Sequence, residues 1–302
     1  MIDFKTVELS DKEWMEPLIA ASDFSGCHHN FGNIFAWSKI NKTRIGRVND
    51  FLVVKGGEEE HLQDYFYPTG KGDIKSALLE LKKDAQERGH KFSLIGVSPE
   101  NIKELDSLFP GMFRYEANVD SFDYVYTLEK LSTLSGKKLH SKRNHINNFK
   151  KNNDNWSFEI INTNNIDECR EMNKLWCIEA GCYDDDELKK EACAVKRFFD
   201  NFTALGLDGG LLRLDGKVIA FTLGERLNSN TYVTHVEKAF KDVQGAYPLI
   251  NNEFAIFIRE KYPELIYVNR EEDVGEEGLR KAKQSYYPDK MEEKYTATFI
   301  GE

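Results

Sequence analysis

The order of strands and helices that the sequence predicts occurs twice along the chain, once in each half. Strands are expected where apolar and polar residues alternate, and helices where apolar residues recur every three or four positions. In each half the expected order is strand, two helices, three strands, helix, strand, helix and strand. Independent errors would rarely give the same order twice. The sequence therefore predicts two tandem copies of one α+β unit.

The boundary between the copies is expected near residues 130–136, a stretch rich in small polar residues. A chain of 302 residues is long enough for two domains of average size. We therefore expect an N-terminal domain over residues 1–132 and a C-terminal domain over residues 133–302. The expected strand at 122–128 then belongs to the first domain, and the expected strand at 293–300 belongs to the second.

Composition limits the class of protein. Hydrophobic residues make up 40% of the chain and charged residues 30%, which is typical of a globular protein with real cores. No apolar run approaches the roughly 18 residues that would span a bilayer, and the first residues lack the pattern of a signal peptide. We therefore expect a cytoplasmic protein with no integral membrane association. The net charge of -10 argues against general binding of DNA.

Metal and disulfide sites are not expected. The five cysteines are an odd number and include no Cys-x-x-Cys pair, which argues against a disulfide framework and a zinc knuckle. His28 and His29 lie beside Cys27, but no further ligands follow at a suitable spacing. The sequence also contains neither Gly-x-Ser-x-Gly nor Gly-x-Gly-x-x-Gly, so hydrolase and dehydrogenase functions have no support.

A basic segment interrupts this acidic chain at residues 134–153, with the sequence LSGKKLHSKRNHINNFKKNN. Its candidate ligand-binding residues carry basic or imidazole groups: Lys138, Lys142, Arg143 and His145. If the segment is helical, Ile146 and Phe149 can anchor it through one face. A cationic surface of this kind suits a phosphorylated ligand. A solvated helix that offsets neighbouring acids is the alternative interpretation.

Four motifs in the second half resemble a known family: KKLHSKRNHINNF, HVEKAF, QGAYPLINNEF and NREEDVGEEGLRKAKQSYYP. They are similar to the family that includes the C-terminal domain of phosphatidylglycerol lysyltransferase, and they cover most of residues 123–300. The expected element order also resembles the GNAT acyltransferase fold and the Fem-type transferases, which are tandem GNAT units that use aminoacyl-tRNA. The resemblance implies two tandem GNAT-like domains. The lipid-modifying enzymes have a membrane-spanning part that this sequence does not contain, so the resemblance leaves open whether phosphatidylglycerol is the acceptor.

The resemblance implies a donor site at residues 244–246, where GNAT proteins have their phosphate loop. Backbone N–H groups of Gly245, Ala246 and Tyr247 would then point toward a phosphate at the start of a helix. An ordinary strand-to-helix turn is the alternative for this segment. In the first half, Asp73 precedes the corresponding helix and would repel an anion, so we expect the first domain to be degenerate.

Two candidate proton acceptors lie in the expected strand YVTHVEKAF. Strand alternation puts His235 and Glu237 on one face, and the resemblance implies that one face lines the opening between two central strands. Either group could accept a proton from an attacking amine or hydroxyl. A structural ion pair, or a satisfied polar group at a strand end, is the alternative for both.

The final motif adds further candidates, which follow a strand and enter a short helix: Asp273 and Tyr286 for catalysis, and Asn269, Arg270, Arg280 and Lys283 for binding the donor. Arg280 and Lys283 lie three residues apart on one helical face, so both are expected to face an anionic substrate. The same charges would also complement the dipole of a solvated helix, which is the alternative.

These observations predict a transferase that moves an acyl or aminoacyl group onto an amine or hydroxyl acceptor. The expected donors are acyl-CoA and aminoacyl-tRNA, with the tRNA acceptor end as a candidate partner and no tightly bound cofactor. Direct attack by the acceptor is expected, because no activated cysteine or serine nucleophile is evident. The alternative function is a non-catalytic GNAT-like module that binds a nucleotide or another anionic ligand.

Overall fold

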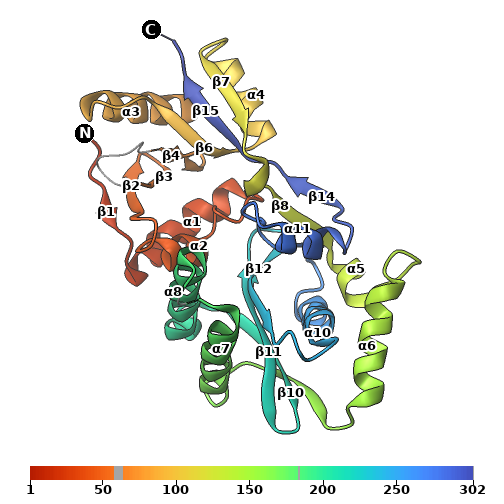
Figure 1. Cartoon of the computed structure of the whole chain (residues 1–302). Helices are drawn as coiled ribbons and strands as arrows, with labels where there is room; N and C mark the ends of the chain where they lie inside the picture. The colour runs from red at the N-terminus through yellow and green to blue at the C-terminus, as the bar shows by residue number, and fades with distance from the viewer. Residues whose placement is uncertain (58–63, 183, 302) are drawn as a thin grey trace. The chain divides into compact units, whose positions relative to one another are not determined.

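The computed structural model describes residues 1–57, 64–182 and 184–301 (Figure 1). The chain forms two compact units, each of which is described by itself. Unit 1 comprises Met1–Asp123, Glu272–Arg280 and Met291–Glu302, and unit 2 comprises Tyr124–Glu271 and Lys281–Lys290. Each unit contains helices and a β-sheet, as the predicted α+β class requires.

Unit 1 contains a sheet with the strand order β1-β2-β3-β4-β6-β15-β7, in which β5 also pairs with β3. Its strands are β1 (Lys5–Thr6), β2 (Arg44–Val48), β3 (Phe51–Lys55), β4 (Tyr65–Phe66), β5 (Thr69–Gly70), β6 (Ser93–Val97), β7 (Phe113–Ala117) and β15 (Tyr295–Phe299). β2 and β3 form a hairpin through Asn49 and Asp50. Asn49 has a φ of 52°, a conformation that asparagine tolerates in tight turns.

The helices of unit 1 include one that packs on this sheet through an apolar face. They are the 3-10 helices η1 (Leu9–Asp11) and η2 (Val119–Ser121), and the α-helices α1 (Lys12–Ser22), α2 (Phe31–Trp37), α3 (Ile74–Glu87) and α4 (Pro99–Leu108). Leu78 and Leu81 of α3 share one buried cluster with Val53 of β3 and Leu94 of β6. Asp73 accepts a hydrogen bond from the Ser76 N–H and so caps α3, which confirms the predicted start of this helix.

Unit 2 is built on a sheet with the order β14-β8-β13-β12-β11-β10-β9. Its strands are β8 (Asp123–Thr127), β9 (Trp156–Ile160), β10 (Asp208–Leu214), β11 (Lys217–Arg226), β12 (Thr231–Ala239), β13 (Tyr267–Asn269) and β14 (Lys290–Glu292). Its helices are α5 (Leu128–Thr133), α6 (His140–Asn152), α7 (Ile166–Ala180), α8 (Asp186–Asp200), α9 (Phe202–Leu205) and α10 (Ala246–Lys261). α11 (Glu277–Gln284) begins in unit 1 and ends in unit 2, since unit 1 extends to Arg280 and unit 2 resumes at Lys281. Figure 1 shows α10 on one side of β11 and β12, and α7 and α8 on the other.

No helix within the described ranges has both the length and the apolar character needed to cross a bilayer. The longest described helix, α10, has 16 residues and includes charged side chains in its last turn.

Two strands join the sheet of the opposite half of the sequence. β15, expected in the second half at 293–300, pairs with β6 and β7 in the sheet of unit 1. β8, expected in the first half at 122–128, pairs with β13 in the sheet of unit 2. The expectation that each half completes its own sheet is therefore wrong. The predicted division into domains 1–132 and 133–302 rests on the repeat in the sequence. The pairing of these two strands does not test that division, which stays a prediction.

Two central strands of unit 2 separate along their length. β12 and β13 are parallel neighbours over three residue pairs, from Thr231–Tyr267 to Val233–Asn269. β12 continues to Ala239 while it remains paired with β11 on its other side. We call residues 234–239 of β12 the strand opening, because among the described residues they have no partner on β13. A GNAT-like fold implies such a separation.

Candidate functional site

An ion pair connects the two strands at the strand opening. Arg270, which follows β13, donates from Nη2 to Oε1 of Glu237 on β12 at 2.9 Å. Asn251 of α10 donates from Nδ2 to the other carboxylate oxygen of Glu237, also at 2.9 Å. The Glu237 and Arg270 side chains are 12% and 11% exposed. The structure thus holds a nearly buried carboxylate in a fixed orientation where the strands part.

Two tyrosines flank the guanidinium of Arg270. Its central carbon lies 5.0 Å from the ring centroid of Tyr286 and 5.7 Å from that of Tyr126, distances that allow cation–π attraction. Tyr126 donates its hydroxyl to the carbonyl of Lys283 at 2.7 Å. Burial raises the pKa of Tyr286 well above its ordinary value, so its phenol is neutral near pH 7. The structure places Tyr286 beside Arg270, the ion-pair partner of Glu237. The predicted catalytic role of Tyr286 stays a prediction.

The basic segment supplies a lysine to the same group of side chains. Lys142 of α6 has its Nζ 4.1 Å from the centroid of the Tyr286 ring. Burial and the charge of Arg270 lower the pKa of Lys142, and Glu237 opposes this shift. Ile146 and Phe149 are buried, which confirms the predicted anchoring face of the helix. Two motifs that lie far apart in the sequence therefore meet at Tyr286.

Other cations of the basic segment contact the protein itself. Arg143 donates from Nη1 to the carbonyls of Leu134 and Gly136, the latter at 2.8 Å. Lys138 lies over the ring of Tyr287, with its Nζ 5.3 Å from the centroid. These contacts give Arg143 and Lys138 structural partners, and their predicted role in donor binding stays a prediction.

The predicted donor loop lies against α6. Gly245 precedes α10 with a φ of 93°, and a Cβ there would lie 2.8 Å from the His145 carbonyl oxygen. Glycine is therefore needed both for the conformation and for the close approach. The Ala246 N–H donates to the Val243 carbonyl at 3.1 Å, so this donor is already used. Phosphate binding by Gly245, Ala246 and Tyr247 stays a prediction.

Tyr247 extends from the first turn of α10 toward β12. Burial raises the pKa of its hydroxyl, while the backbone N–H of Ala239 and the indole of Trp176 oppose the rise. A pocket of about 270 Å³ lies between the loop that precedes α10 and α6. It is lined by polar side chains together with two apolar ones: His145, Asn148, Phe149, Asn152, Asn153, Asp242, Val243 and Gln244. The structure thus brings His145 next to the predicted donor loop.

His235 and Glu237 do not share a face of β12. Leu223 of β11 pairs with Val236 and Gly224 pairs with Thr234, so His235 is the extra residue of a β-bulge. The bulge interrupts the alternation, and the His235 ring stacks on Phe198 of α8 at 4.7 Å, whereas Glu237 contacts α10. The predicted common face is therefore wrong, because the alternation rule assumes a regular ladder.

Both ring nitrogens of His235 contact carboxylates. Nδ1 lies 2.8 Å from Glu271 and Nε2 lies 3.0 Å from Glu225. Burial alone would lower the pKa of His235, but the hydrogen bonds and charges of the two carboxylates raise it to about 9. This geometry favours the structural alternative for His235, and its role as a proton acceptor stays a prediction.

Two predicted binding residues of the final motif support its backbone in unit 2. Lys283 is buried and donates from Nζ to the carbonyls of Arg270 and Glu271, at 2.7 and 3.1 Å. Asn269 is fully buried, and its Oδ1 accepts the Glu271 N–H at 2.7 Å. Glu271 has a φ of 56°, so these contacts hold a strained turn in place. Lys283 is 7% exposed and its ammonium is used by these carbonyls, and the predicted roles of Lys283 and Asn269 in donor binding stay predictions.

Asp273 and Arg280 belong to unit 1 and bind each other. Arg280 donates from Nε and Nη2 to the two carboxylate oxygens of Asp273, both at 2.8 Å, and from Nη2 to Asp120 at 2.6 Å. Asp273 is 2% exposed. Glu237 and Tyr286 lie in unit 2, so the structure does not gather the predicted catalytic residues in one unit. The predicted roles of Asp273 in catalysis and of Arg280 in binding stay predictions.

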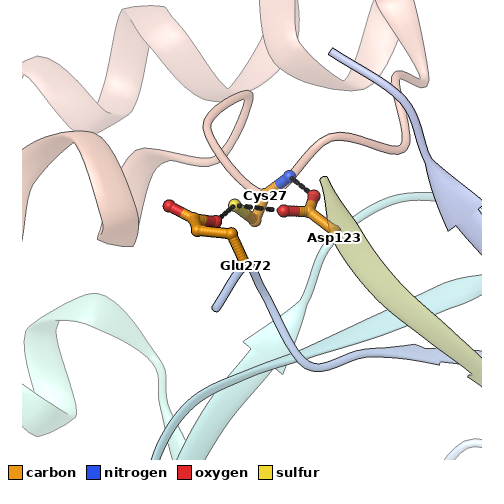
Figure 2. A group of neighbouring side chains, drawn as sticks. All are labelled: Cys27, Asp123 and Glu272. Carbon is orange, nitrogen blue, oxygen red and sulfur yellow. Dashed lines mark hydrogen bonds between the residues drawn. The ribbon is translucent and has the colours of Figure 1, made fainter. Parts of the chain in front are cut away.

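Unit 1 contains a cluster of polar side chains that the sequence analysis did not predict: Cys27, Asp123 and Glu272 (Figure 2). The Cys27 N–H donates to Asp123 at 2.9 Å, and the Cys27 Sγ lies 3.2 Å from a carboxylate oxygen of Glu272. Their ligand atoms lie within 4.8 Å of one another, as a metal site would require. The Lys294 ammonium lies 2.5 Å from Asp123 and already supplies a positive charge there. These residues are too far apart in sequence for spacing to reveal them.

Comparisons with known proteins agree with this architecture. A conserved protein of unknown function from Bacteroides thetaiotaomicron is 39% identical, with a TM-score of 0.92 and coverage of 99% of this chain and 100% of that one. L-PGS from Bacillus licheniformis is 13% identical, with a TM-score of 0.65 and coverage of 97% and 93%. FemX is 9% identical, with a TM-score of 0.61 and coverage of 98% and 97%. A comparison with curated protein sequences finds no match.

At such low identities L-PGS and FemX show the fold alone, and they confirm the predicted α+β, tandem GNAT-like and Fem-type fold. The family model described as phosphatidylglycerol lysyltransferase, C-terminal, matches residues 19–298, so the chain belongs to that family.

Proposed function

We propose that the chain transfers an aminoacyl or acyl group from aminoacyl-tRNA or acyl-CoA to an amine or hydroxyl acceptor, which attacks the donor carbonyl at the strand opening of unit 2. The observation that carries this proposal is the Glu237–Arg270 ion pair between the separating strands, with Asn251 of α10 as its third member. The name of the family describes a lysyl transfer, which supports aminoacyl transfer in particular.

In the proposed step the acceptor nitrogen or oxygen forms a bond to the donor carbonyl carbon. The bond from that carbon to the ribose oxygen or to the coenzyme A sulfur breaks, and the leaving atom takes up one proton through water, which replaces it with the proton that Glu237 has received. The proton of the acceptor passes to Glu237, which Arg270 and Asn251 hold in position. Fixing both reactants in one place lowers the entropic part of the barrier.

Donor binding is proposed for the start of α10 and the neighbouring α6. The N–H groups of Gly245 and Tyr247 lie where the helix dipole favours a phosphate. The basic helix α6 packs against Gly245 through His145 and Phe149, and its positive charge favours a phosphate at this loop. His235 has no part in the proposed step, since both of its ring nitrogens contact carboxylates. Asp273 and Arg280 have no part in it either, since they bind each other and belong to unit 1.

The test measures donor binding and transfer separately. The purified chain is incubated at low salt with aminoacyl-tRNA or acyl-CoA and a panel of amine and hydroxyl acceptors, and deacylated donor and modified acceptor are quantified. Glu237→Gln should keep donor binding and lose transfer by about 10²-fold or more, as for loss of a general base. Glu179→Gln, an exposed carboxylate on α7, is the matched control and should behave like the wild type.

Failure of both donors to bind would contradict the proposal. Donor binding without any transfer by the wild type would instead support the alternative, a non-catalytic module that binds an anionic ligand.

A further inference from the structure

Two buried polar atoms beside the Glu237 carboxylate have no hydrogen-bond partner among the described residues. They are Nη1 of Arg270 and Oδ1 of Asn251. Asn251 is 6% exposed, so its amide oxygen lies out of bulk water. An unpaired buried donor or acceptor costs about 1–3 kcal/mol. One donor and one acceptor, both on residues that hold Glu237, are therefore left without partners.

The orientation of the Asn251 amide follows from its bond to Glu237. A carboxylate only accepts hydrogen bonds, so the amide must present its Nδ2 to Glu237, as it does at 2.9 Å. The Oδ1 atom then necessarily faces away from that bond. It is an acceptor that only a donor from outside the described protein groups can satisfy.

The charges at this place do not balance. Arg270 and Lys142 both pack on the ring of Tyr286, with their charged groups 5.0 and 4.1 Å from its centroid. Glu237 neutralises Arg270, but no carboxylate among the described residues pairs with Lys142. The two cations and one carboxylate leave one positive charge in a half-buried position. A half-buried charge without a counterion is costly, and this partial burial lowers the pKa of Lys142.

We infer that unit 2 binds, at this place, a small molecule that carries both an amine and an acid group. The acid group contacts Lys142 and Nη1 of Arg270, and the amine donates to Oδ1 of Asn251 beside the Glu237 carboxylate. One such ligand supplies an acceptor for Nη1 of Arg270, a donor for Oδ1 of Asn251 and a negative charge beside Lys142. The inference rests on the proposed function, because it names the acceptor class and puts the amine next to the proton acceptor.

Calorimetric titration without any donor tests this inference. The probes are glycylglycine, with an amine and a carboxylate, and phosphoethanolamine, with an amine and a phosphate. Propionate and propylamine each carry one of the two groups. Each two-group probe that fits should bind about tenfold or more tightly than propionate and propylamine. The preference between glycylglycine and phosphoethanolamine shows whether the acid is a carboxylate or a phosphate.

Two variants test the contacts of the acid group and of the amine separately. Lys142→Met should weaken propionate and the two-group probes by about tenfold or more, and leave propylamine unchanged. Asn251→Leu should weaken propylamine and the two-group probes, and leave propionate unchanged. Lys151→Met, an exposed cation on the same helix, is the matched control and should change nothing. If Asn251→Leu does not fold, the titrations of Lys142→Met decide whether the inference holds.

The inference is overturned if propionate binds as tightly as both two-group probes, if neither two-group probe binds, or if Lys142→Met binds them like the wild type. These titrations do not depend on transfer. Probe binding without transfer would contradict the proposed function alone, whereas transfer to single-group acceptors without probe binding would overturn only this inference.

Discussion

At the scale of single residues, neighbours decide what His235 can do. Nothing in the sequence YVTHVEKAF distinguishes a neutral proton acceptor from a charged structural group. The structure surrounds the ring with Phe198 and the carboxylates of Glu225 and Glu271. These carboxylates outweigh the effect of burial and raise the pKa to about 9. A histidine charged near pH 7 donates from both nitrogens and has no lone pair for a proton.

This raised pKa makes stability depend on pH. Between the ordinary value of 6.5 and the folded value of about 9, the folded state binds more protons at His235 than the unfolded state. The stabilisation is fully present below about pH 6.5 and is lost as the pH rises through about 9, by about 3 kcal/mol in total. Urea unfolding at a series of pH values measures it.

The same titration of His235→Gln should lack this loss, so the difference from the wild type should shrink toward high pH. His140→Gln, an exposed histidine on α6, should keep the wild-type profile. A difference between wild type and His235→Gln that is constant from pH 6 to 10 would contradict the assigned charge.

At the scale of elements, helices were predictable where their ends carry local signals. The sequence pattern predicts helices over residues 99–108 and about 246–261, and α4 and α10 have these bounds in the structure. Ser98 caps α4 by accepting the Asn101 N–H, and Pro99 fits the first turn. The bulge at His235 was not predictable, because it depends on how the residues of β12 pair with those of β11. The sequence of either strand alone does not show this register.

The turn before α10 gives a prediction at this scale. Gly245→Ala would combine a positive φ with a Cβ only 2.8 Å from the His145 carbonyl, so α6 and the donor loop must move apart. Gly181→Ala is the matched control, since its φ of 75° is also positive but a Cβ there meets open space. The control should lose about 1–2 kcal/mol of unfolding free energy, and Gly245→Ala about 1–3 kcal/mol more.

Chemical denaturation measures both stabilities, and donor binding to Gly245→Ala should weaken as well. Equal losses for the two variants would show that the contact between α6 and the loop is unimportant.

At the scale of the whole molecule, the sequence predicted two α+β units but not which strands complete each sheet. Local pattern shows that 293–300 is a strand, whereas its partners β6 and β7 are fixed by tertiary packing. The same limit applied to the sites. Lys142 and Tyr286 were predicted separately, and only the fold shows that they touch. The group around Cys27 left no signal at all, because it draws on separate segments of the chain.

That buried group predicts how unit 1 responds to losing its cation. Lys294→Met would leave the fully buried Asp123 carboxylate without its ion-pair partner, which costs about 3–5 kcal/mol of unfolding free energy. Lys103→Met removes an exposed lysine from α4 and should cost less than about 0.5 kcal/mol. Guanidinium unfolding compares the two, and a loss for Lys294→Met no larger than for the control would exclude a stabilising role for the ion pair.

The most direct measurement is hydrogen–deuterium exchange of the intact chain, with and without an amide-linked analogue of aminoacyl-tRNA. If donor and acceptor meet at the strand opening, the backbone of residues 234–247 and of β13 should exchange more slowly with the analogue bound. Protection confined to other segments, such as the β10–β11 turn, with unchanged exchange at the strand opening would contradict the account.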